Sequence, residues 1–342
     1  MQKIKSAIAF FGSHTEYLFL IIAVPAIITF VVYTPPAWGL DEQVHIARAY
    51  QISLGELYPN PLGGGPGHYG GMLPRGLVDN LNHGHSESNS VDRGQPFYMR
   101  KDIVDIARNQ RIEGKGIKDS HFTEYDFGPT GLYSPIIYAP ASTGFFIARH
   151  INLTVDGSVE LARIMQSISY CIVCFAALFA LRRQKIRWLV FITALLPTSI
   201  FQASIITADT FTIAAVILFF SLLCRFLSKS YRFNRRYTYA LAGASLLLAL
   251  TKPSYALLLG MLFFIPANKY WYKGKAHYVK YGIMLLSVMT FILTSLIEFL
   301  LVNIPLLIIS PESKLEAEVS WGKNPIPTID NANKRIANRL II

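Results

Sequence analysis

Long apolar runs constrain this chain more than any other feature of its sequence. A helix needs about 20 apolar residues to cross a bilayer. The composition agrees with several crossings, because 52% of the 342 residues are hydrophobic and only 15% are charged, against about 25% charged in soluble domains. These features predict an all-α polytopic membrane protein. Five runs approach or exceed the length of a crossing, at 17–36, 161–181, 188–206, 210–227 and 281–309.

Basic residues gather in the short loops between these runs. Segments 182–187, 225–236 and 268–280 contain 13 Lys and Arg and no Asp or Glu. Cytoplasmic loops carry such an excess, so the net charge of +11 indicates topology and not nucleic-acid binding. Residues 1–16 are expected in the cytoplasm, and no small-residue cleavage site follows the first run. We expect an uncleaved first transmembrane helix over 17–36.

If 182–187 is cytoplasmic, residues 37–158 form one long external loop. It holds six of the eight histidines, and loops of this length usually carry function. Within it, 41–54 is predicted to be helical, and 132–149 to be a helix lying in the membrane interface. The stretches 61–71 and 82–90 are rich in glycine and polar residues, so we expect them to be mobile.

The apolar run 240–266 contains one charged residue, Lys252, directly before Pro253. A lysine at mid-membrane costs roughly 2.5–3.5 kcal/mol and usually marks function. Proline disfavours helix at the residue before it. Because both flanks of the run are basic, we expect a hairpin of two short helices with Lys252 at its tip; one kinked helix is the alternative. The transmembrane bundle then spans 159–309 and leaves 310–342 as an external tail.

Charged residues at membrane edges fall on the external side of this topology. We single out Asp41, Glu42, Arg163, Asp209 and Lys252, with His45 and Arg48 on the helical stripe of Asp41. The structural alternatives are an N-cap for Asp41 or Asp209, a first-turn charge for Glu42, and an ion pair of Arg163 with Glu160. Together the charges suit transfer from a phosphate-linked lipid, in which a carboxylate accepts a proton and a cation stabilises the phosphate.

Several segments carry a family resemblance, over about residues 17–266. The runs "PPAWGLDEQVHIARAYQISLGEL", "LYSPIIYAPASTGFFIARHINL", "LARIMQS", "LLPTSIFQASIITADTF" and "LLLALTKPSYALLL" resemble a bacterial domain-of-unknown-function family of polytopic membrane proteins. That family is similar to the C-type glycosyltransferases, which use polyprenyl-phosphate sugars. The resemblance implies a catalytic base at Asp41 with Glu42, and matches Arg163, Asp209 and Thr251-Lys252-Pro253. The insert 61–71 departs from the pattern. The end at "ANKRIANRLII" implies truncation, because relatives continue further.

These expectations combine into one functional hypothesis with two alternatives. The chain is expected to transfer a sugar from a polyprenyl-phosphate donor to a cell-envelope glycan, at the outer face of the bacterial cytoplasmic membrane. Asp41 and Glu42 are the expected catalytic residues, and Lys252, Arg163, Asp209, His45 and Arg48 the expected donor or substrate contacts. No metal ligands are assigned, although a divalent metal is optional in the resembled superfamily. The alternatives are a transporter or flippase of lipid-linked glycans and a non-catalytic subunit of an envelope-assembly complex.

Overall fold

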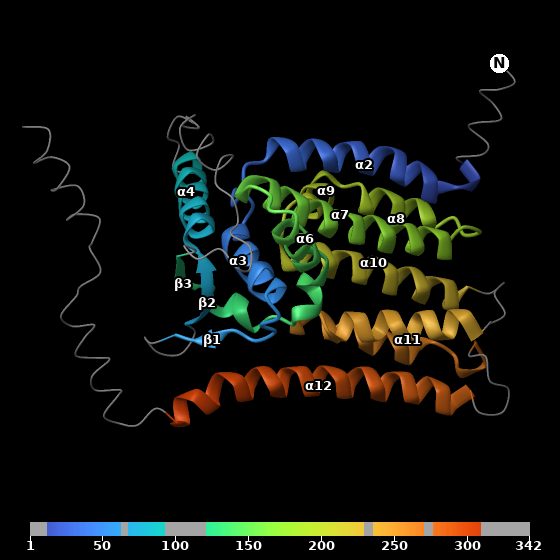
Figure 1. The fold of residues 1–342 in the computed structure, drawn as a ribbon. Coiled ribbons are helices and arrows are strands. Elements are labelled where there is room, and N and C mark those ends of the chain that lie inside the picture. Colours follow the sequence, from blue (N-terminus) through green and yellow to red (C-terminus); the bar gives the residue numbers. More distant parts are fainter. Residues whose placement is uncertain (1–11, 63–67, 93–120, 229–234, 270–275, 309–342) are drawn as a thin grey trace, which may run out of the picture.

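Four helices in the described part of the chain are long and apolar enough to cross a membrane, which confirms the predicted all-α polytopic class. They are α2 (Thr15–Tyr33), α7 (Val155–Ala180), α10 (Ala208–Leu227) and α12 (Ala276–Ile308). In the computed structural model they lie roughly side by side (Figure 1). The structure describes residues 12–62, 68–92, 121–228, 235–269 and 276–308.

The run 188–206 is not one helix, as its hydropathy suggested, but two. Helix α8 (Arg187–Ala194) and helix α9 (Pro197–Ser204) are separated at Leu196, whose ψ of 137° is extended. The residue before a proline avoids the helical region for steric reasons, and Pro197 then occupies the first turn of α9, where its missing N–H costs nothing. Both short helices pack against α2 and α7.

The run 240–266 is divided at Lys252 into two arms. Helix α11 (Arg235–Ala249) forms the first arm, and η3 (Pro253–Phe264) returns alongside it as a 3₁₀-helix, followed by the short turn η4 (Ala267–Lys269). Both arms pack against α12 (Figure 1).

The segment between α2 and α7 gathers at one end of the bundle, which we call the loop end (Figure 1). Its helices are α3 (Glu42–Ser53), α4 (Arg75–Asp92), η1 (Gly128–Leu132), η2 (Pro135–Tyr138) and α6 (Ala139–His150). A buried apolar cluster joins this region to α7 and includes Ile46, Tyr50, Tyr138, Phe145 and Val159.

Both glycine-rich and polar stretches of this segment contribute to regular structure, although residues 63–67 of the first lie outside the described part of the chain. An antiparallel sheet of order β1-β2-β3 is formed by β1 (Asn60–Pro61), β2 (Tyr69–Pro74) and β3 (Phe122–Asp126). At Gly70 an added Cβ would stand 2.2 Å from the Tyr125 carbonyl oxygen, so this glycine allows close strand pairing. Residues 82–90 belong to α4. There a Cβ on Gly84 would stand 2.3 Å from the Pro36 carbonyl oxygen, so α4 packs directly on the segment before Asp41.

Candidate functional site

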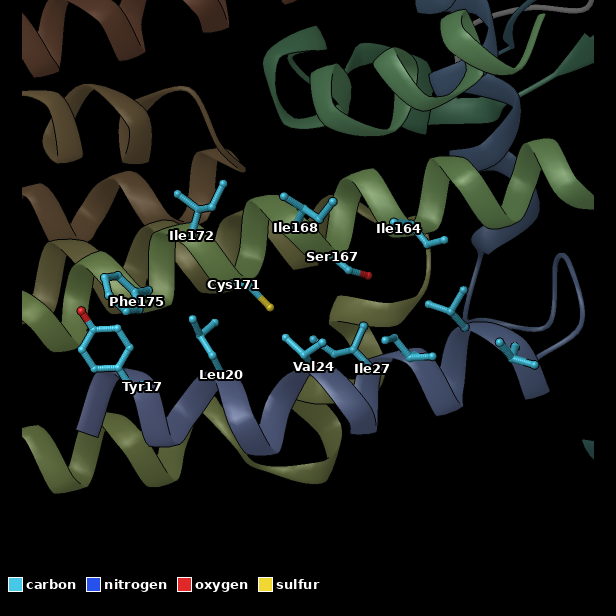
Figure 2. A pocket seen from close by; sticks show the side chains of 13 residues that line it. Tyr17, Leu20, Val24, Ile27, Ile164, Ser167, Ile168, Cys171, Ile172 and Phe175 are labelled. Atoms are coloured by element: carbon cyan, nitrogen blue, oxygen red, sulfur yellow. The ribbon is translucent and has the colours of Figure 1, made fainter. Parts of the chain in front are cut away.

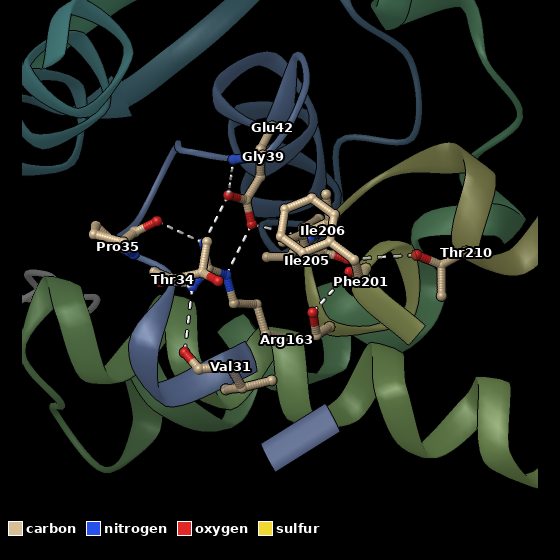
Figure 3. A network of polar contacts seen from close by, with 11 residues as sticks. Val31, Thr34, Pro35, Gly39, Glu42, Arg163, Phe201, Ile205, Ile206 and Thr210 are labelled. Atoms are coloured by element: carbon tan, nitrogen blue, oxygen red, sulfur yellow. Dashed lines mark hydrogen bonds and ion pairs between the residues drawn. The ribbon is translucent and has the colours of Figure 1, made fainter. Parts of the chain in front are cut away.

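A buried ion pair joins the start of α3 to α7. The Arg163 guanidinium donates to Glu42 from Nε at 2.8 Å and from Nη2 at 2.6 Å, and neither side chain is exposed. The two carboxylate oxygens also accept backbone N–H groups, from Ile206 at 3.0 Å and from Gly39 at 3.1 Å. Figure 3 shows these contacts converging on Glu42. Its carboxylate is therefore fully engaged within the protein.

The same guanidinium satisfies carbonyl groups at the end of α2. It donates from Nη1 to the carbonyls of Thr34 and, at 3.4 Å, Val31, and from Nη2 to that of Pro35 at 2.9 Å (Figure 3). The last carbonyls of a helix lack partners within the helix, so Arg163 fixes where α2 ends. The structural alternative of an interfacial pair with Glu160 is wrong, because Arg163 is fully buried and pairs with Glu42.

Asp41 lies immediately outside this buried network. Its backbone is left-handed, with φ of 53°, and that of Ala37 is also left-handed, with φ of 63°. Such values are uncommon for residues other than glycine, although Asp and Asn adopt them more readily. Asp41 occupies the N-cap position of α3, as the structural alternative expected, but its exposed side chain caps no N–H of the helix. Its carboxylate is open to solvent.

Lys252 and Asp209 form a second ion pair, with Lys252 Nζ 2.6 Å from Asp209 Oδ1. Asp209 stands in the first turn of α10, but Thr207 is the residue that caps this helix. The alternative that Asp209 is only a cap is therefore wrong. The side chains of Lys252 and Asp209 are 23% and 35% exposed, so the pair is open on one side. Lys252, the single charged residue of the run 240–266, is thus neutralised by Asp209 on the separate helix α10.

Aromatic rings lie beside the Lys252 ammonium. Its Nζ is 5.4 Å from the centre of the Tyr133 ring, and the His45 ring stacks on Tyr133 at 6.3 Å between centres and 13° between planes. The Nδ1 atom of His45 lies 2.7 Å from the Tyr138 hydroxyl. Burial, reinforced by the Lys252 charge and opposed by Asp209, lowers the pKa of His45 to about 4. His45 is therefore neutral near pH 7.

Tyr133 and Tyr138 were not among the residues that the sequence singled out. Both belong to the segment "LYSPIIY", which the hydropathy pattern marked only as an interfacial helix. Tyrosines within an apolar segment are a sequence signal, because a buried tyrosine normally needs a hydrogen-bond partner for its hydroxyl. The sequence does not say which residue that partner is.

Arg48 is not part of the Lys252 cluster, although the helical stripe placed it with Asp41 and His45. It is 1% exposed and donates from Nη1 to Gln51 Oε1 and from Nη2 to the Leu57 carbonyl at 2.6 Å. Burial lowers the pKa of Arg48 to about 10. The three residues of the predicted stripe therefore have different surroundings: Asp41 is exposed, His45 lies beside Lys252, and Arg48 is enclosed.

An apolar groove runs between α2 and α7, with a volume of about 520 Å³ (Figure 2). Its walls extend from Tyr17 and Phe175 at one end to Val31 and Ile164 at the other. The latter end adjoins the buried network, because Arg163 precedes Ile164 and contacts the Val31 carbonyl. The groove therefore leads along the bundle to the segment that carries Asp41.

Within the described residues, no group of three or more His, Cys, Asp or Glu side chains could hold a metal ion. The Asp209 carboxylate is shared with Lys252, and the Glu42 carboxylate is enclosed by donors. The structure thus offers single exposed carboxylates rather than a ligand cluster.

The helices and the charged contacts at their loop end define a polytopic membrane protein with a polar centre at one end of its bundle. The chain belongs to the family described as "Predicted membrane protein (DUF2142)", whose model matches residues 26–325. No curated protein and no solved structure matches the chain.

Proposed function

We propose that the protein is a membrane glycosyltransferase that moves a sugar from a polyprenyl-phosphate donor to a cell-envelope glycan at the outer face of the bacterial cytoplasmic membrane. The observation that carries this proposal is the half-open Lys252–Asp209 pair beside Tyr133, at the end of the bundle where Asp41 is exposed. Ionisable residues retained in membrane segments mark functional sites. The motif resemblance to C-type glycosyltransferases supplies the reaction class.

In this reaction the oxygen of an acceptor hydroxyl forms a bond to the anomeric carbon of the donor sugar. The bond between that carbon and the phosphate oxygen breaks, and its electron pair leaves with the polyprenyl phosphate. A carboxylate accepts the proton of the acceptor hydroxyl. Lys252 is the cation suited to stabilise the departing phosphate, because an ammonium forms strong charge-assisted contacts with phosphate oxygens.

Asp41 suits the role of base better than Glu42 does. A base must reach its substrate and must be free to take a proton. The carboxylate of Glu42 is buried and receives four N–H donors, whereas that of Asp41 is exposed. We assign Glu42 and Arg163 to holding the Asp41 segment in place. Asp209 then positions Lys252, and His45 contributes a neutral polar wall.

The groove between α2 and α7 suits the lipid tail of the donor. Its lining is almost wholly apolar and lies within the membrane-spanning segments. Its Ile164 end adjoins the buried network that holds the segment before Asp41. A tail lying in this groove would leave its phosphate at the loop end, at the depth of the lipid headgroups.

The test is a transfer assay with the purified full chain in lipid nanodiscs. Radiolabelled polyprenyl-phosphate sugar is supplied together with envelope glycan isolated from cells that lack the protein. We expect label in the glycan with the wild type and about a hundredfold less with Lys252→Met. A transporter would instead move the labelled donor across vesicles without forming a new glycosidic bond. An unlabelled glycan, together with an unchanged envelope glycan profile in the deletion strain, would exclude the transferase.

A further inference from the structure

A second cavity lies behind the Lys252 cluster and shares one wall with it. Its volume is about 190 Å³, and it lies between the 58–59 segment, residues 131–135 and α12. The shared wall is Tyr133, whose ring is also 5.4 Å from Lys252 Nζ. Thr294 and Ile297 close the cavity from α12, and Arg48 lines it from α3.

Arg48 gives this cavity a buried positive charge whose hydrogen bonding is incomplete. Its two terminal nitrogens donate to neutral acceptors, and its Nε–H is buried without a hydrogen-bond partner. The Glu56 carboxylate favours the charged form of Arg48 through space, but it accepts a hydrogen bond from Gln51, and no direct ion pair with Arg48 is formed among the described residues. A buried charge is costly unless an opposite charge or several hydrogen bonds compensate it. An anionic ligand in the cavity would supply the direct charged contact that Glu56 does not make.

The remaining walls limit the size and shape of that ligand. Drug-sized ligands occupy about 300–1,000 Å³, so this cavity suits a single ring rather than a nucleotide or a lipid. Tyr58 and Tyr133 provide aromatic surface, and Ser134 provides a hydroxyl. Aromatic faces accept the C–H face of a sugar ring, and hydroxyl and carbonyl groups accept its polar edge. The lining thus combines sugar-type contacts with one enclosed cation.

We propose that this cavity binds an acidic sugar, with its ring against Tyr133 and its anionic substituent toward Arg48. The inference rests on the proposed transferase in one respect, because it names the acceptor class as a glycan that contains an acidic sugar. Since Tyr133 separates the cavity from Lys252, an acceptor bound there would lie next to the donor phosphate. The binding itself requires no transfer and can be measured alone.

The experiment is isothermal titration calorimetry on the full chain in nanodiscs, with glucuronate, glucose and inorganic phosphate as probes. We expect saturable binding of glucuronate and at least tenfold weaker binding of glucose. Arg48→Met should weaken glucuronate binding by at least tenfold. Phosphate that binds as tightly as glucuronate and competes with it would overturn the sugar assignment and leave a simple anion site.

A matched pair of α12 variants keeps the test decisive if Arg48→Met does not fold. Thr294→Trp places an indole in the cavity, whereas Thr290→Trp lies one helical turn away and outside it. Both threonine hydroxyls bond only within α12, to carbonyls three or four residues before. Glucuronate binding should be lost in Thr294→Trp and retained in Thr290→Trp. Equal binding by the two variants, or no binding by the wild type, would overturn the proposal.

The two proposals fail separately. Lys252→Met should lower transfer by about a hundredfold and keep glucuronate binding, because Lys252 does not line the cavity. Transfer to a neutral glycan without glucuronate binding would refute the cavity assignment alone. If the wild type binds glucuronate but transfers no sugar, the transferase proposal is refuted. The cavity assignment then still stands.

Discussion

Glu42 and Arg163 are 121 positions apart in the sequence, yet they form a two-contact ion pair that is closed to solvent. The pair ties the end of α2, the start of α3 and the connection before α10 to one point on α7. Asp41 precedes Glu42, and Asp209 follows the connection by a few residues. The positions of the exposed Asp41 carboxylate and of the partly exposed Asp209 carboxylate therefore depend on a pair that is itself inaccessible to substrate.

Removing one member of this pair should destabilise the protein. In Glu42→Gln, Arg163 remains buried without a counter-charge, and such changes cost about 3–5 kcal/mol. We expect a clearly lower midpoint of thermal unfolding, measured by intrinsic fluorescence in detergent micelles. Glu42→Gln/Arg163→Met should recover part of the loss, because no unpaired charge remains. Wild-type stability in Glu42→Gln would contradict the structural role assigned to Glu42.

Asp41→Asn should reduce sugar transfer without changing the stability of the protein. Asparagine adopts the left-handed conformation about as readily as aspartate, and the Asp41 side chain caps no helix. Stability should therefore be unchanged. If Asp41 is the base, sugar transfer should fall by at least about a hundredfold. Asp41→Gly provides the control, since it keeps the backbone conformation and also removes the carboxylate. Normal transfer by either variant would shift the base to Asp209.

Lys252→Met should lower transfer by about a hundredfold, the usual effect of removing one electrostatic contact to a developing anion. Membrane insertion should be equal or better, because a charge is removed from an apolar run. Asp209 loses its partner but is partly exposed, so the cost in stability should be small. Lys252→Arg should recover part of the activity. Initial rates and protein levels in membranes check these expectations, and full activity in the methionine variant would refute the phosphate contact.

Stability should fall as the pH is lowered through the range set by His45. Its pKa is about 4 in the folded protein, against about 6.5 for an unperturbed histidine, so the unfolded state binds the additional proton between these values. Lys252 opposes protonation, Asp209 favours it, and Tyr138 contacts the ring. At pH 5 the loss from this group is about 2 kcal/mol. His45→Gln should reduce the difference between melting curves at pH 7.5 and pH 5. An identical difference in wild type and variant would contradict the buried neutral imidazole.

Orientation can be tested by thiol labelling in a variant that lacks Cys171, Cys174 and Cys224. Leu40→Cys is placed at the loop end, where the native side chain is 75% exposed. Lys185→Cys is placed in the acid-free basic loop at the other end. A membrane-impermeant reagent added to cells should label position 40 and not position 185. Labelling only at position 185 would invert the topology inferred from the basic loops.

Hydropathy was sufficient to predict the elements that depend on local sequence. It predicted α2, α7, α10 and α12 to within a few residues at most of their ends. It missed the break at Pro197 because the flanking residues are uniformly apolar, although the proline itself was a sufficient signal. It missed β2 because Gly70 and Gly71 are poor strand formers in isolation.

The site was predictable as a set of residues but not as a set of contacts. Cations in apolar segments usually pair with another charged group, so a carboxylate partner was to be expected for Arg163 and for Lys252. A single sequence does not say which carboxylate approaches which cation, because the pairing depends on how distant helices pack. Glu42 and Asp41 are adjacent in sequence, and only the fold shows that one is enclosed and the other exposed.

The 3₁₀ winding of η3 sets the reach of the Lys252 hairpin. Twelve residues rise about 24 Å in a 3₁₀-helix, at about 2.0 Å each, but only about 18 Å in an α-helix. The α-helical arm α11 has 15 residues and rises about 22 Å, so the two unequal arms reach similar heights. Rewinding η3 as an α-helix would draw its end back by about 6 Å. The two arms that flank Lys252 are thus matched in length by helix type, although their numbers of residues differ.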